Sequence, residues 1–520
     1  MASGWWPCVV LLLACFFAAG QAPPHVNEAH YLCKAKQFHD PDFAAGDFFL
    51  ESRNVHTLFY ATFGQLTNYF ELPTVAWIGR WINWSLLSLA LVVILRSAGA
   101  RGSLLLAGGL AIIGLTPLTA MAGEWIVGGT EAKGPAFALA ILAVAAVSRG
   151  RWDLAVLLCG FATAWHALIG GWLGLLCLVG GLLERGPKKL LTRSYIVMGI
   201  LAAFGVLYGV FPALRLNHGV SPETCDQAAQ IYVFRRLGHH LLFSRFAPSA
   251  IAGHFALWGA FVLLWVPTRS DPQIRRVGHL VFGAGGLMLA GILLSILSPI
   301  APQFAADSLR LYWFRTADWL LPLGVVFLLV RFYQSQPVTS IPRKATLLAS
   351  LILFLAAYPS FMSRWSDRHI PPASKQAGVL LREPRDYQIK RMNEWQEVCG
   401  WIKDNTPQSS IWITPQRQQT FKWYSSRAEV VNWKDIPQSA TGIHQWWQRY
   451  QELYPSEVID SGLVAHSEDQ LRKLATKYGA TWILIDRRQS KERLSFPQIY
   501  PTEASKPGWF VIYRIPTEQK

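Results

Sequence analysis

Long apolar runs alternate along the chain with short polar segments, and most of those segments carry Lys or Arg. A helix needs about 20 mostly apolar residues to cross a bilayer, and cytoplasmic loops collect basic residues. The pattern therefore predicts membrane spans, which we place at residues 5–22, 75–95, 104–120, 137–147, 154–183, 195–211, 251–266, 281–297, 319–330 and 347–361.

The run at 154–183 differs from the others because basic residues border it at both ends. A single span would put one of these basic clusters on the wrong side of the membrane. We therefore predict a hairpin of two short helices that turns near Trp165, His166 and Gly170. With this hairpin the chain has about eleven predicted spans.

The polar segment after the first run has apolar residues at helical spacing, among them Val55, Leu58 and Phe59. This spacing predicts one or two amphipathic helices within residues 31–70, lying in the membrane interface. We expect residues 1–22 to be an uncleaved span, and a cleaved signal peptide is the alternative. In both cases the chain that follows emerges on the outer side of the membrane.

From about Arg364 the composition becomes that of a soluble domain, in which short apolar runs alternate with amphipathic stretches. Such alternation predicts a small α/β layer. We expect strands at 410–414, 481–485 and 509–513, and helices at 393–403, 442–453 and 468–478. The predicted fold is a polytopic α-helical membrane bundle, residues 1–363, followed by a small extracytoplasmic α/β domain, residues 364–520.

The composition agrees with this fold, because 52% of the residues are hydrophobic and only 15% are charged. The formal net charge of +16 is carried largely by short loops between apolar runs. This distribution is typical of a protein whose partner is membrane lipid, and it argues against nucleic acid. The C-terminal domain is expected on the outer side.

The seven cysteines have neither a CxxC pair nor metal-ligand spacing. Four lie within apolar runs, where a thiol packs as a small apolar group. Cys33 and Cys225 would both lie on the outer side, and a disulfide between them is an open alternative. The four in apolar runs are Cys8, Cys15, Cys159 and Cys177.

Five acids lie between the first two spans, which themselves contain almost no acids: Glu28, Asp40, Asp42, Asp47 and Glu51. A carboxylate beside a membrane is costly unless it faces water, a partner or a substrate. Glu28 follows the first span most closely, so it is the first candidate for a functional group. Its alternative role is structural, with Asn27 as the N-cap of a helix and Glu28 in the first turn.

The other four acids have simpler explanations. Asp47 and Glu51 are four residues apart, so on a helix they would share a face, and we expect that face to be solvated rather than catalytic. Asp40-Pro41-Asp42 has the spacing of a metal-binding DxD motif. Proline between two Asp residues is also ordinary turn chemistry, and we expect no metal there.

An acid just past the first span, followed by Tyr31-Leu32 and interfacial helices, resembles the GT-C membrane glycosyltransferases. The many spans and the outward α/β domain are similar to that superfamily too. The resemblance implies a sugar donor linked to polyprenyl phosphate and an acceptor that is a glycan, a lipid or a protein. Many members have Asp-Glu where this chain has Asn27-Glu28, so only Glu28 carries over as the catalytic base.

We expect no cofactor beyond the lipid-linked sugar donor. We accordingly expect an integral protein of the bacterial cytoplasmic (inner) membrane that acts in the cell envelope.

Glycosyl transfer from such a donor needs cations for the departing phosphate. Arginine suits this role because its planar fork binds two oxygens at once. Interfacial contact with lipid headgroups is the alternative role for these residues. The predicted outer loops supply six candidates, of which we rank Arg236, His239 and His240 above Arg235, Arg310 and Arg315.

Three further groups of candidates lie in predicted outer segments. Glu131 and Lys133 either pair with each other or form a wall of a sugar pocket. His166, at the hairpin turn, either meets a lipid phosphate or hydrogen-bonds a neighbouring helix. The aromatic residues of the C-terminal domain either stack on sugar rings or pack inside the domain; they are Trp423, Tyr424 and Trp433.

Three functions fit the sequence. The first is a metal-independent, inverting glycosyltransferase with Glu28 as base and the Arg236 loop holding the phosphate. The second is a transporter or flippase of a lipid-linked glycan, and the third is a membrane-anchored glycan-binding protein. Ionisable residues gather in the predicted outer loops rather than within the spans, which favours the enzyme.

Overall fold

The computed structural model describes residues 5–190, 192–335, 362, 364–375, 384–488, 492–502 and 508–516. The chain forms two compact units. The first consists of Met1–Gly20 and Gly79–Ser366, and the second of Gln21–Ile78 and Asp367–Lys520. The polar segment after the first apolar run therefore belongs to the same unit as the C-terminal region. The predicted span at 347–361 lies outside the described residues.

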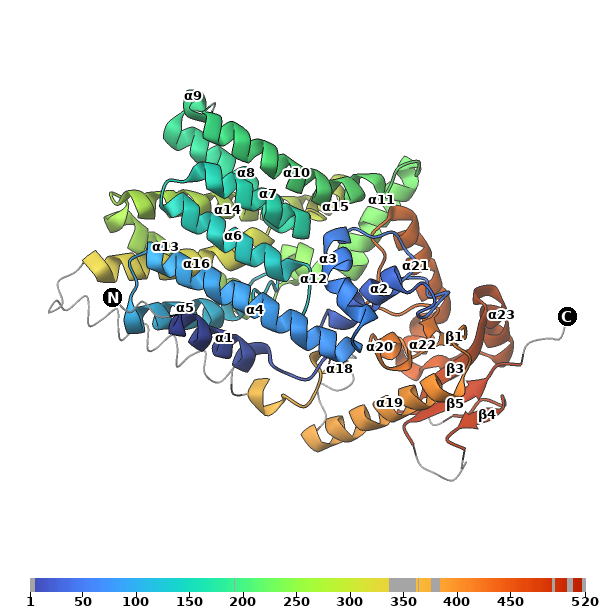
Figure 1. The fold of residues 1–520 in the computed structure, drawn as a ribbon. Helices are drawn as coiled ribbons and strands as arrows, with labels where there is room; N and C mark the ends of the chain where they lie inside the picture. Colours follow the sequence, from blue (N-terminus) through green and yellow to red (C-terminus); the bar gives the residue numbers. More distant parts are fainter. Residues whose placement is uncertain are drawn as a thin grey trace. The chain divides into compact units, whose positions relative to one another are not determined.

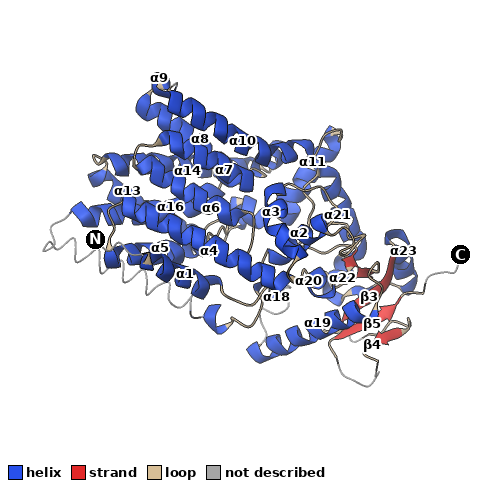
Figure 2. Ribbon diagram, in the orientation of Figure 1, coloured by secondary structure: helices blue, strands red, loops and turns tan. Residues whose placement is uncertain are grey.

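The described part of the first unit is helical (Figure 2). Its elements follow one another in the order of the predicted apolar runs (Figure 1). They are α1 (Trp6–Ala19), α4 (Leu72–Ser97, of which the part from Gly79 belongs here), α5 (Gly102–Thr119), α6 (Lys133–Ser148), α7 (Trp152–Trp165), α8 (Ala167–Arg185), α9 (Pro187–Leu190), α10 (Arg193–Arg215), α11 (Pro222–Gln230), the π-helix η2 (Ile231–Arg236), α12 (Gly238–Leu241), η3 (Phe243–Arg245), α13 (Pro248–Thr268), α14 (Pro272–Leu297), α15 (Pro302–Leu309) and α16 (Arg315–Ser335).

In the described part of the chain, seven helices are long and apolar enough to cross a membrane by length and composition: α4, α5, α8, α10, α13, α14 and α16. The apolar helices α1, α6 and α7 are shorter. The predicted hairpin is confirmed, because α7 and α8 pack together and His166 alone separates them. The expected number of about eleven spans is not confirmed.

Large apolar side chains point outward from the long helices α10, α13 and α14. Phe204 is 66% exposed, Leu263 77% and Ile296 62%. Water would disfavour so much exposed apolar surface on successive helices, whereas lipid tails solvate it. The first unit is therefore built as an integral membrane bundle.

Helices α7 and α10 approach each other closely because glycines line their contact. A Cβ atom added at Gly205 would lie 2.4 Å from the Gly160 carbonyl oxygen, and one at Gly209 would lie 2.0 Å from the Thr163 carbonyl oxygen. Small residues let helix backbones meet in this way, and van der Waals packing then holds membrane helices together. The GxxxG spacing of Gly205 and Gly209 places both glycines on one face of α10.

Three segments predicted to be cytoplasmic lie together at one end of the bundle. Nε of Arg276 in α14 lies 2.8 Å from Glu184 Oε1 of α8, and its Nη1 donates to the Ser148 carbonyl of α6 at 3.3 Å. Arg185 donates to the Gly150 carbonyl. The alternation of ends that the basic clusters predicted is thus present in the fold.

The second unit combines short helices with one sheet (Figure 1). Its described elements are α2 (Glu28–His39), α3 (Thr57–Thr62), η1 (Phe63–Asn68), α18 (Pro372–Lys375), α19 (Arg385–Asn405), β1 (Ile411–Ile413), α20 (Phe421–Ser425), β2 (Ala428–Glu429), α21 (Ala440–Leu453), α22 (Ser456–Ser461), η4 (Leu463–Ala465), α23 (Glu468–Tyr478), β3 (Ala480–Asp486), β4 (Gln498–Tyr500) and β5 (Phe510–Arg514).

The strands form a mixed sheet in the order β2-β1-β3-β5-β4. Strand β1 is parallel to β2 and β3, whereas β5 is antiparallel to β3 and β4. Residues of α19 pack on the sheet, where Trp395, Val398 and Ile402 share a core with Trp412 and Phe510. All six predicted elements of this region are present, and β2, β4 and α20 were not predicted because they are only two to five residues long.

Candidate functional site

A buried carboxylate is the centre of the first candidate site. Glu124 lies in the segment between α5 and α6 and is 5% exposed. Its Oε1 accepts a hydrogen bond from Lys133 Nζ at 2.7 Å, and its other oxygen forms an ion pair with Arg315 Nε. Burial would raise the pKa of this carboxyl, but the charges of Arg315 and Lys133 outweigh it and hold the pKa at about 2. Glu124 is therefore ionised at neutral pH.

The backbone around Glu124 is fixed by a second carboxylate. Asp318, in the first turn of α16, accepts the N–H groups of Met121 at 2.8 Å, Ala122 at 3.0 Å and Glu124 at 3.3 Å. Gly123 lies between them with a φ of +74°, a left-handed conformation that glycine adopts without steric cost. The segment can therefore turn tightly and bring Glu124 to the start of α16.

Two histidines complete the group. His240 in α12 lies with Nδ1 2.6 Å from the Ala122 carbonyl oxygen, and burial together with neighbouring His239 lowers its pKa to about 3. The ring is therefore neutral at neutral pH and donates Nδ1–H to that carbonyl. At the hairpin turn, His166 Nε2 lies 3.4 Å from Arg315 Nη1.

The Arg315 guanidinium also covers an aromatic ring. It lies 4.0 Å from the ring centroid of Tyr312, whose φ of +57° is unusual for a residue other than glycine. The Tyr312 hydroxyl lies 3.0 Å from the Tyr232 hydroxyl of η2. Outliers of this kind persist where surrounding contacts hold them, and they concentrate at functional sites.

Five predicted site residues meet in this group: Glu131, Lys133, His166, His240 and Arg315. Glu131 joins through Lys133, whose Nζ lies 3.6 Å from its carboxylate. The two roles left open for Glu131 and Lys133 in the sequence are thus partly resolved, since they do pair. We call these five residues together with Glu124 and Asp318 the Glu124 cluster.

The remaining predicted cations lie outside the Glu124 cluster. Arg235 and His239 are exposed, and exposed Arg310 lies 3.9 Å from Asp307. Arg236 is 6% exposed and ends the π-helix η2, a helix type that is frequent at functional sites.

Sequence reasoning missed two members of the cluster, Glu124 and Asp318. One signal pointed to Asp318: it is an acid in the first turn of an apolar helix, a position where ionisable residues are usually functional.

The Glu124 cluster contains two cations that reach solvent. The side chains of Arg315 and Lys133 are 17% and 11% exposed, whereas that of Glu124, with which both pair, is 4% exposed. Two partly accessible cations beside the neutral His240 can bind phosphate oxygens with charge-assisted hydrogen bonds.

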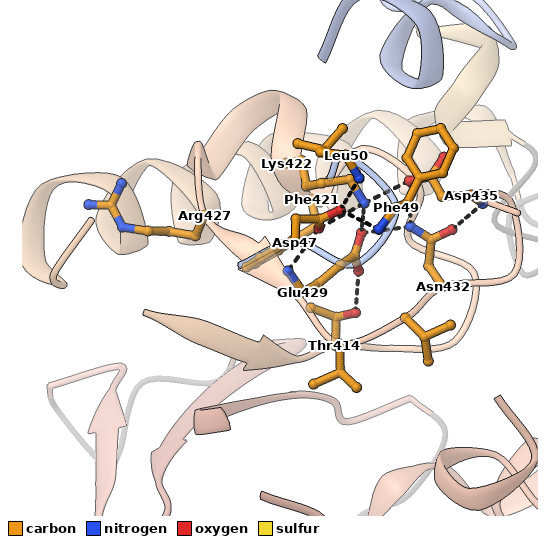
Figure 3. Close-up of polar contacts among 12 residues, drawn as sticks. Asp47, Phe49, Leu50, Thr414, Phe421, Lys422, Arg427, Glu429, Asn432 and Asp435 are labelled. Carbon is orange, nitrogen blue, oxygen red and sulfur yellow. Dashed lines mark hydrogen bonds and ion pairs between the residues drawn. The ribbon is translucent and has the colours of Figure 1, made fainter. Parts of the chain in front are cut away.

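The second unit contains a different buried cluster, centred on Lys422 of α20 (Figure 3). Its Nζ lies 2.7 Å from Glu429 Oε1, 2.7 Å from Asp435 Oδ2 and 3.3 Å from Asp47 Oδ2. Asn432 Nδ2 donates to Glu429 at 2.6 Å and to Asp435 at 2.8 Å. We call these five residues the Lys422 cluster. Arg427 points away from it (Figure 3).

The expectation that Asp47 shares a solvated helical face with Glu51 was wrong. Asp47 is 1% exposed, and Glu51 is exposed and accepts the Gly46 N–H. The chain from Pro41 to Ser52 forms turns, because Ala44 and Gly46 have φ values of 49° and 86°, which no α-helix contains. The turns direct Asp47 inward to Lys422.

Glu28 begins α2 in the second unit and is fully buried. Its Oε2 accepts the His25 N–H at 2.6 Å, and Asn27 holds the N-cap position without a side-chain capping hydrogen bond. The carboxylate is thus withdrawn from solvent and turned toward the segment before the helix. A solvated end of an interfacial helix would instead leave it exposed.

The remaining candidates from the sequence are Asp40, Asp42, Cys33 and Cys225. Asp40 ends α2, Asp42 is exposed in the following turn, and no group of three or more His, Cys, Asp or Glu residues in the described ranges is arranged to hold a metal. Cys33 and Cys225 are free thiols, so the open disulfide is not formed.

Trp423 is 5% exposed, and Trp433 packs against Trp446 and Tyr450 at centroid distances of 5.5 and 4.8 Å. Tyr424 packs against the core of the sheet domain. These aromatic residues therefore pack inside the domain.

Residues 393–453 match a domain of unknown function, DUF6798. No curated protein matches the sequence. Among solved structures, the chain is similar to the oligosaccharyltransferase of Archaeoglobus fulgidus.

The apo form of that enzyme is 11% identical, with a TM-score of 0.45 over 93% of this chain and 70% of that chain. A form tethered to an acceptor peptide with the NVT sequon is 10% identical, with a TM-score of 0.47 over 93% and 69%. The same organism's AglB, in complex with an inhibitory peptide and a dolichol-phosphate, is 11% identical, with a TM-score of 0.36 over 92% and 69%.

Proposed function

We propose that this protein is a membrane glycosyltransferase that moves a sugar from a polyprenyl-phosphate-linked donor to an acceptor at the outer face of a bacterial cytoplasmic membrane. The observation that carries the proposal is the convergence of Arg315 and Lys133 on buried Glu124. Four predicted outer segments meet there, at one end of an apolar bundle, which is where the headgroup phosphate of a lipid-linked donor would lie.

The Glu124 cluster holds the phosphate in this proposal. Arg315 binds two phosphate oxygens through its planar fork, and Lys133 contributes a point charge. When the bond between the sugar C1 and the phosphate oxygen breaks, the phosphate leaves with the bonding electron pair. Fixed cations stabilise that developing charge without having to reorganise. Arg236, on the buried turn of η2, is the next candidate for a phosphate contact.

Glu28 is the base in this proposal. It takes the proton of the acceptor nucleophile while that atom forms its bond to C1 on the face opposite the departing phosphate, so the configuration at C1 inverts. Burial of Glu28 supports the role, because enzymes use carboxylates withdrawn from water as general bases. No divalent metal takes part, since Arg315 and Lys133 supply the positive charge.

The test measures sugar transfer in membranes supplied with a radiolabelled polyprenyl-phosphate sugar, for two variants. We expect Glu28→Gln to lower kcat by about 10²- to 10⁴-fold, the usual contribution of a general base. Arg315→Gln should raise the KM for the donor by about 10- to 100-fold, because it removes hydrogen bonds to a charged group.

Glu51→Gln and Arg310→Gln are the matched controls, since both side chains are exposed and lie outside the Glu124 cluster. Undiminished turnover in Glu28→Gln would end the assignment of the base. Movement of intact donor across the bilayer, without a new glycosidic bond, would identify the chain as a flippase instead.

A further inference from the structure

The Lys422 cluster is tied to the helix that begins with Glu28. His30, one of the first residues of α2, lies with Nδ1 2.9 Å from Asp435 Oδ1, and its ring lies 4.3 Å from that of Phe49. Asp435 in turn contacts Lys422 at 2.7 Å. A direct path of polar contacts therefore runs from α20, through Asp435, to the first turn of α2.

A second path reaches the same helix one turn further along. Lys34 Nζ donates to the carbonyls of Phe49 at 2.7 Å and Ser52 at 2.9 Å. Asp47 caps that turn, since its Oδ1 accepts the Leu50 N–H at 2.9 Å while its Oδ2 accepts the Glu429 N–H at 3.1 Å. Helix α2 is thus fixed at two points, His30 and Lys34, to groups that contact Lys422 or its partners.

His30, through which α2 is attached, lies on a different side of the helix from Glu28. Successive residues are rotated by about 100°, so residues 28 and 30 are about 200° apart and lie on nearly opposite sides of α2. The Lys422 cluster therefore contacts the helix from one side and leaves the Glu28 side to other partners. An attachment of this kind can set the position of Glu28 without touching its carboxylate.

Burying the charged groups of the Lys422 cluster costs free energy, which argues against a role in core stability alone. Lys422, Glu429, Asp47 and Asp435 are each at most 3% exposed, and one cation stands among three carboxylates. Apolar residues of similar volume would usually be as stabilising as such a group, or more so. Buried ionic groups can instead specify one geometry, as polar residues do in helix pairing.

We infer that His30, Asp435 and Lys422 form a positioning cluster, through which the C-terminal domain holds α2 and its residue Glu28 in the geometry that proton transfer requires. The inference rests on the proposed function. These three residues are positioning residues, because they act through α2 and do not touch the reacting atoms. The C-terminal domain accordingly takes part in each turnover by fixing the first polar segment.

Burial lowers the pKa of His30 even though the hydrogen bond to Asp435 raises it, so the ring is neutral and donates Nδ1–H. His30 can therefore be tested through its hydrogen bond rather than through its charge. His30→Ala removes the donor, whereas His30→Asn keeps an N–H donor at a similar distance from the backbone. His466→Ala is the control, because His466 is also buried in this unit and bonds the Leu453 carbonyl at 3.0 Å, away from α2.

The experiment uses the full-length protein in membranes and measures kcat, KM and the hydrogen exchange of the amides of residues 28–39. We expect His30→Ala to lower kcat about 100-fold at unchanged donor KM, since a displacement near 1 Å of a reacting group has that effect. Exchange in α2 should become about tenfold faster. His30→Asn should restore most of kcat, and His466→Ala should leave both kcat and α2 exchange unchanged.

Asp435→Asn is the second variant, and Asp486→Asn is its control. Asp486 forms a buried ion pair with Arg391 at 2.6 Å, so its loss also weakens the domain but leaves α2 untouched. Only Asp435→Asn should lower kcat. If His30→Ala keeps full kcat while Glu28→Gln is inactive, the inference about positioning is wrong and the proposed function stands. Full turnover in Glu28→Gln would overturn the proposed function and this inference with it.

Discussion

The two buried charge clusters differ in how their cations and carboxylates are paired. In the Glu124 cluster, Arg315 and Lys133 both pair with Glu124 and are partly exposed, while Glu131 pairs with Lys133 and Asp318 accepts backbone N–H groups. In the Lys422 cluster, three carboxylates share one cation, and every member is at most 3% exposed. A group that must receive an anion needs accessible cations, whereas a group that fixes geometry needs to be closed. Pairing and access together therefore distinguish the two clusters, and they favour the Glu124 cluster as the ligand site of the proposed function.

The two clusters also differ in how their charged side chains are held in place. Asp318 holds the Glu124 segment through three backbone N–H groups, so the position of Glu124 does not depend on its own ion pairs. The carboxylates around Lys422 also accept hydrogen bonds from other groups, Asp47 from backbone N–H groups and Glu429 and Asp435 from Asn432, but all three share Lys422 as their cation. Removal of the central charge should accordingly have unequal effects.

Lys422→Met gives the largest expected effect. It leaves three buried carboxylates without their cation, and breaking a buried pair in this way costs about 3–5 kcal/mol. We expect thermal unfolding of the detergent-solubilised protein, followed by fluorescence of the buried tryptophans, to show the second unit unfolding at a much lower temperature. Lys477→Met is the control, since Lys477 pairs with Glu452 at the surface, where an ion pair contributes about 0–1 kcal/mol.

Glu124→Gln is the matching change in the first unit. It leaves Arg315 and Lys133 partly exposed to solvent, so we expect a smaller loss, about 1–3 kcal/mol. Equal destabilisation by Lys422→Met and Glu124→Gln would contradict the distinction between an open and a closed cluster.

Acidification should weaken the Glu124 cluster through His240. Burial lowers the folded-state pKa of His240 to about 3, whereas in the unfolded chain this histidine takes up its proton near its ordinary pKa of 6.5. Below pH 6.5 the unfolded state therefore binds more protons, and stability falls as the pH falls toward 3. Between pH 6.5 and 5 the loss is about 1–2 kcal/mol.

The check is the unfolding temperature of the solubilised protein against pH, for the wild type and for His240→Asn. The variant cannot titrate, so its curve should be flatter between pH 6.5 and 5. Glu124, whose folded-state pKa is about 2, contributes only below its ordinary pKa of 4.5, where stability also falls as the pH falls. If the unfolding temperature changes equally with pH in the wild type and in His240→Asn, His240 is not buried in the Glu124 cluster.

The sequence was most informative where structure is local. Hydropathy places the helices because each apolar run is contiguous, and the basic residues at both ends of 154–183 correctly required the hairpin. The strands at 480–486 and 510–514 were recognisable for the same reason. Such signals depend on neighbouring residues and therefore survive without knowledge of the tertiary fold.

The clusters were less predictable, because their members are distant in sequence. The Glu124 N–H and its acceptor Asp318 are 194 residues apart, and Asp47 and its donor Glu429 are 382 residues apart. The i,i+4 spacing predicted that Asp47 lies on a solvated helical face. Two nearby residues with positive φ turn the chain instead and direct Asp47 inward. The choice of Arg315 over the more exposed Arg235 and Arg310 likewise depends on packing that no local pattern encodes.

Tyr312 allows the smallest and most specific test of how the Glu124 cluster orients its cation. Tyr312→Phe keeps the ring beneath the Arg315 guanidinium and removes the hydroxyl contact with Tyr232, a hydrogen bond that contributes about 0.5–1.5 kcal/mol. We expect the donor KM to rise about 2- to 10-fold with kcat unchanged, because Arg315 still lies over the ring but the support from η2 is lost. Tyr312→Leu, which also removes the ring, should raise KM further.

Tyr208→Phe, on an exposed tyrosine of α10, is the control and should change neither constant. If Tyr312→Phe and Tyr208→Phe behave alike, η2 does not support the site, and the Glu124 cluster holds Arg315 through Glu124 and the ring of Tyr312.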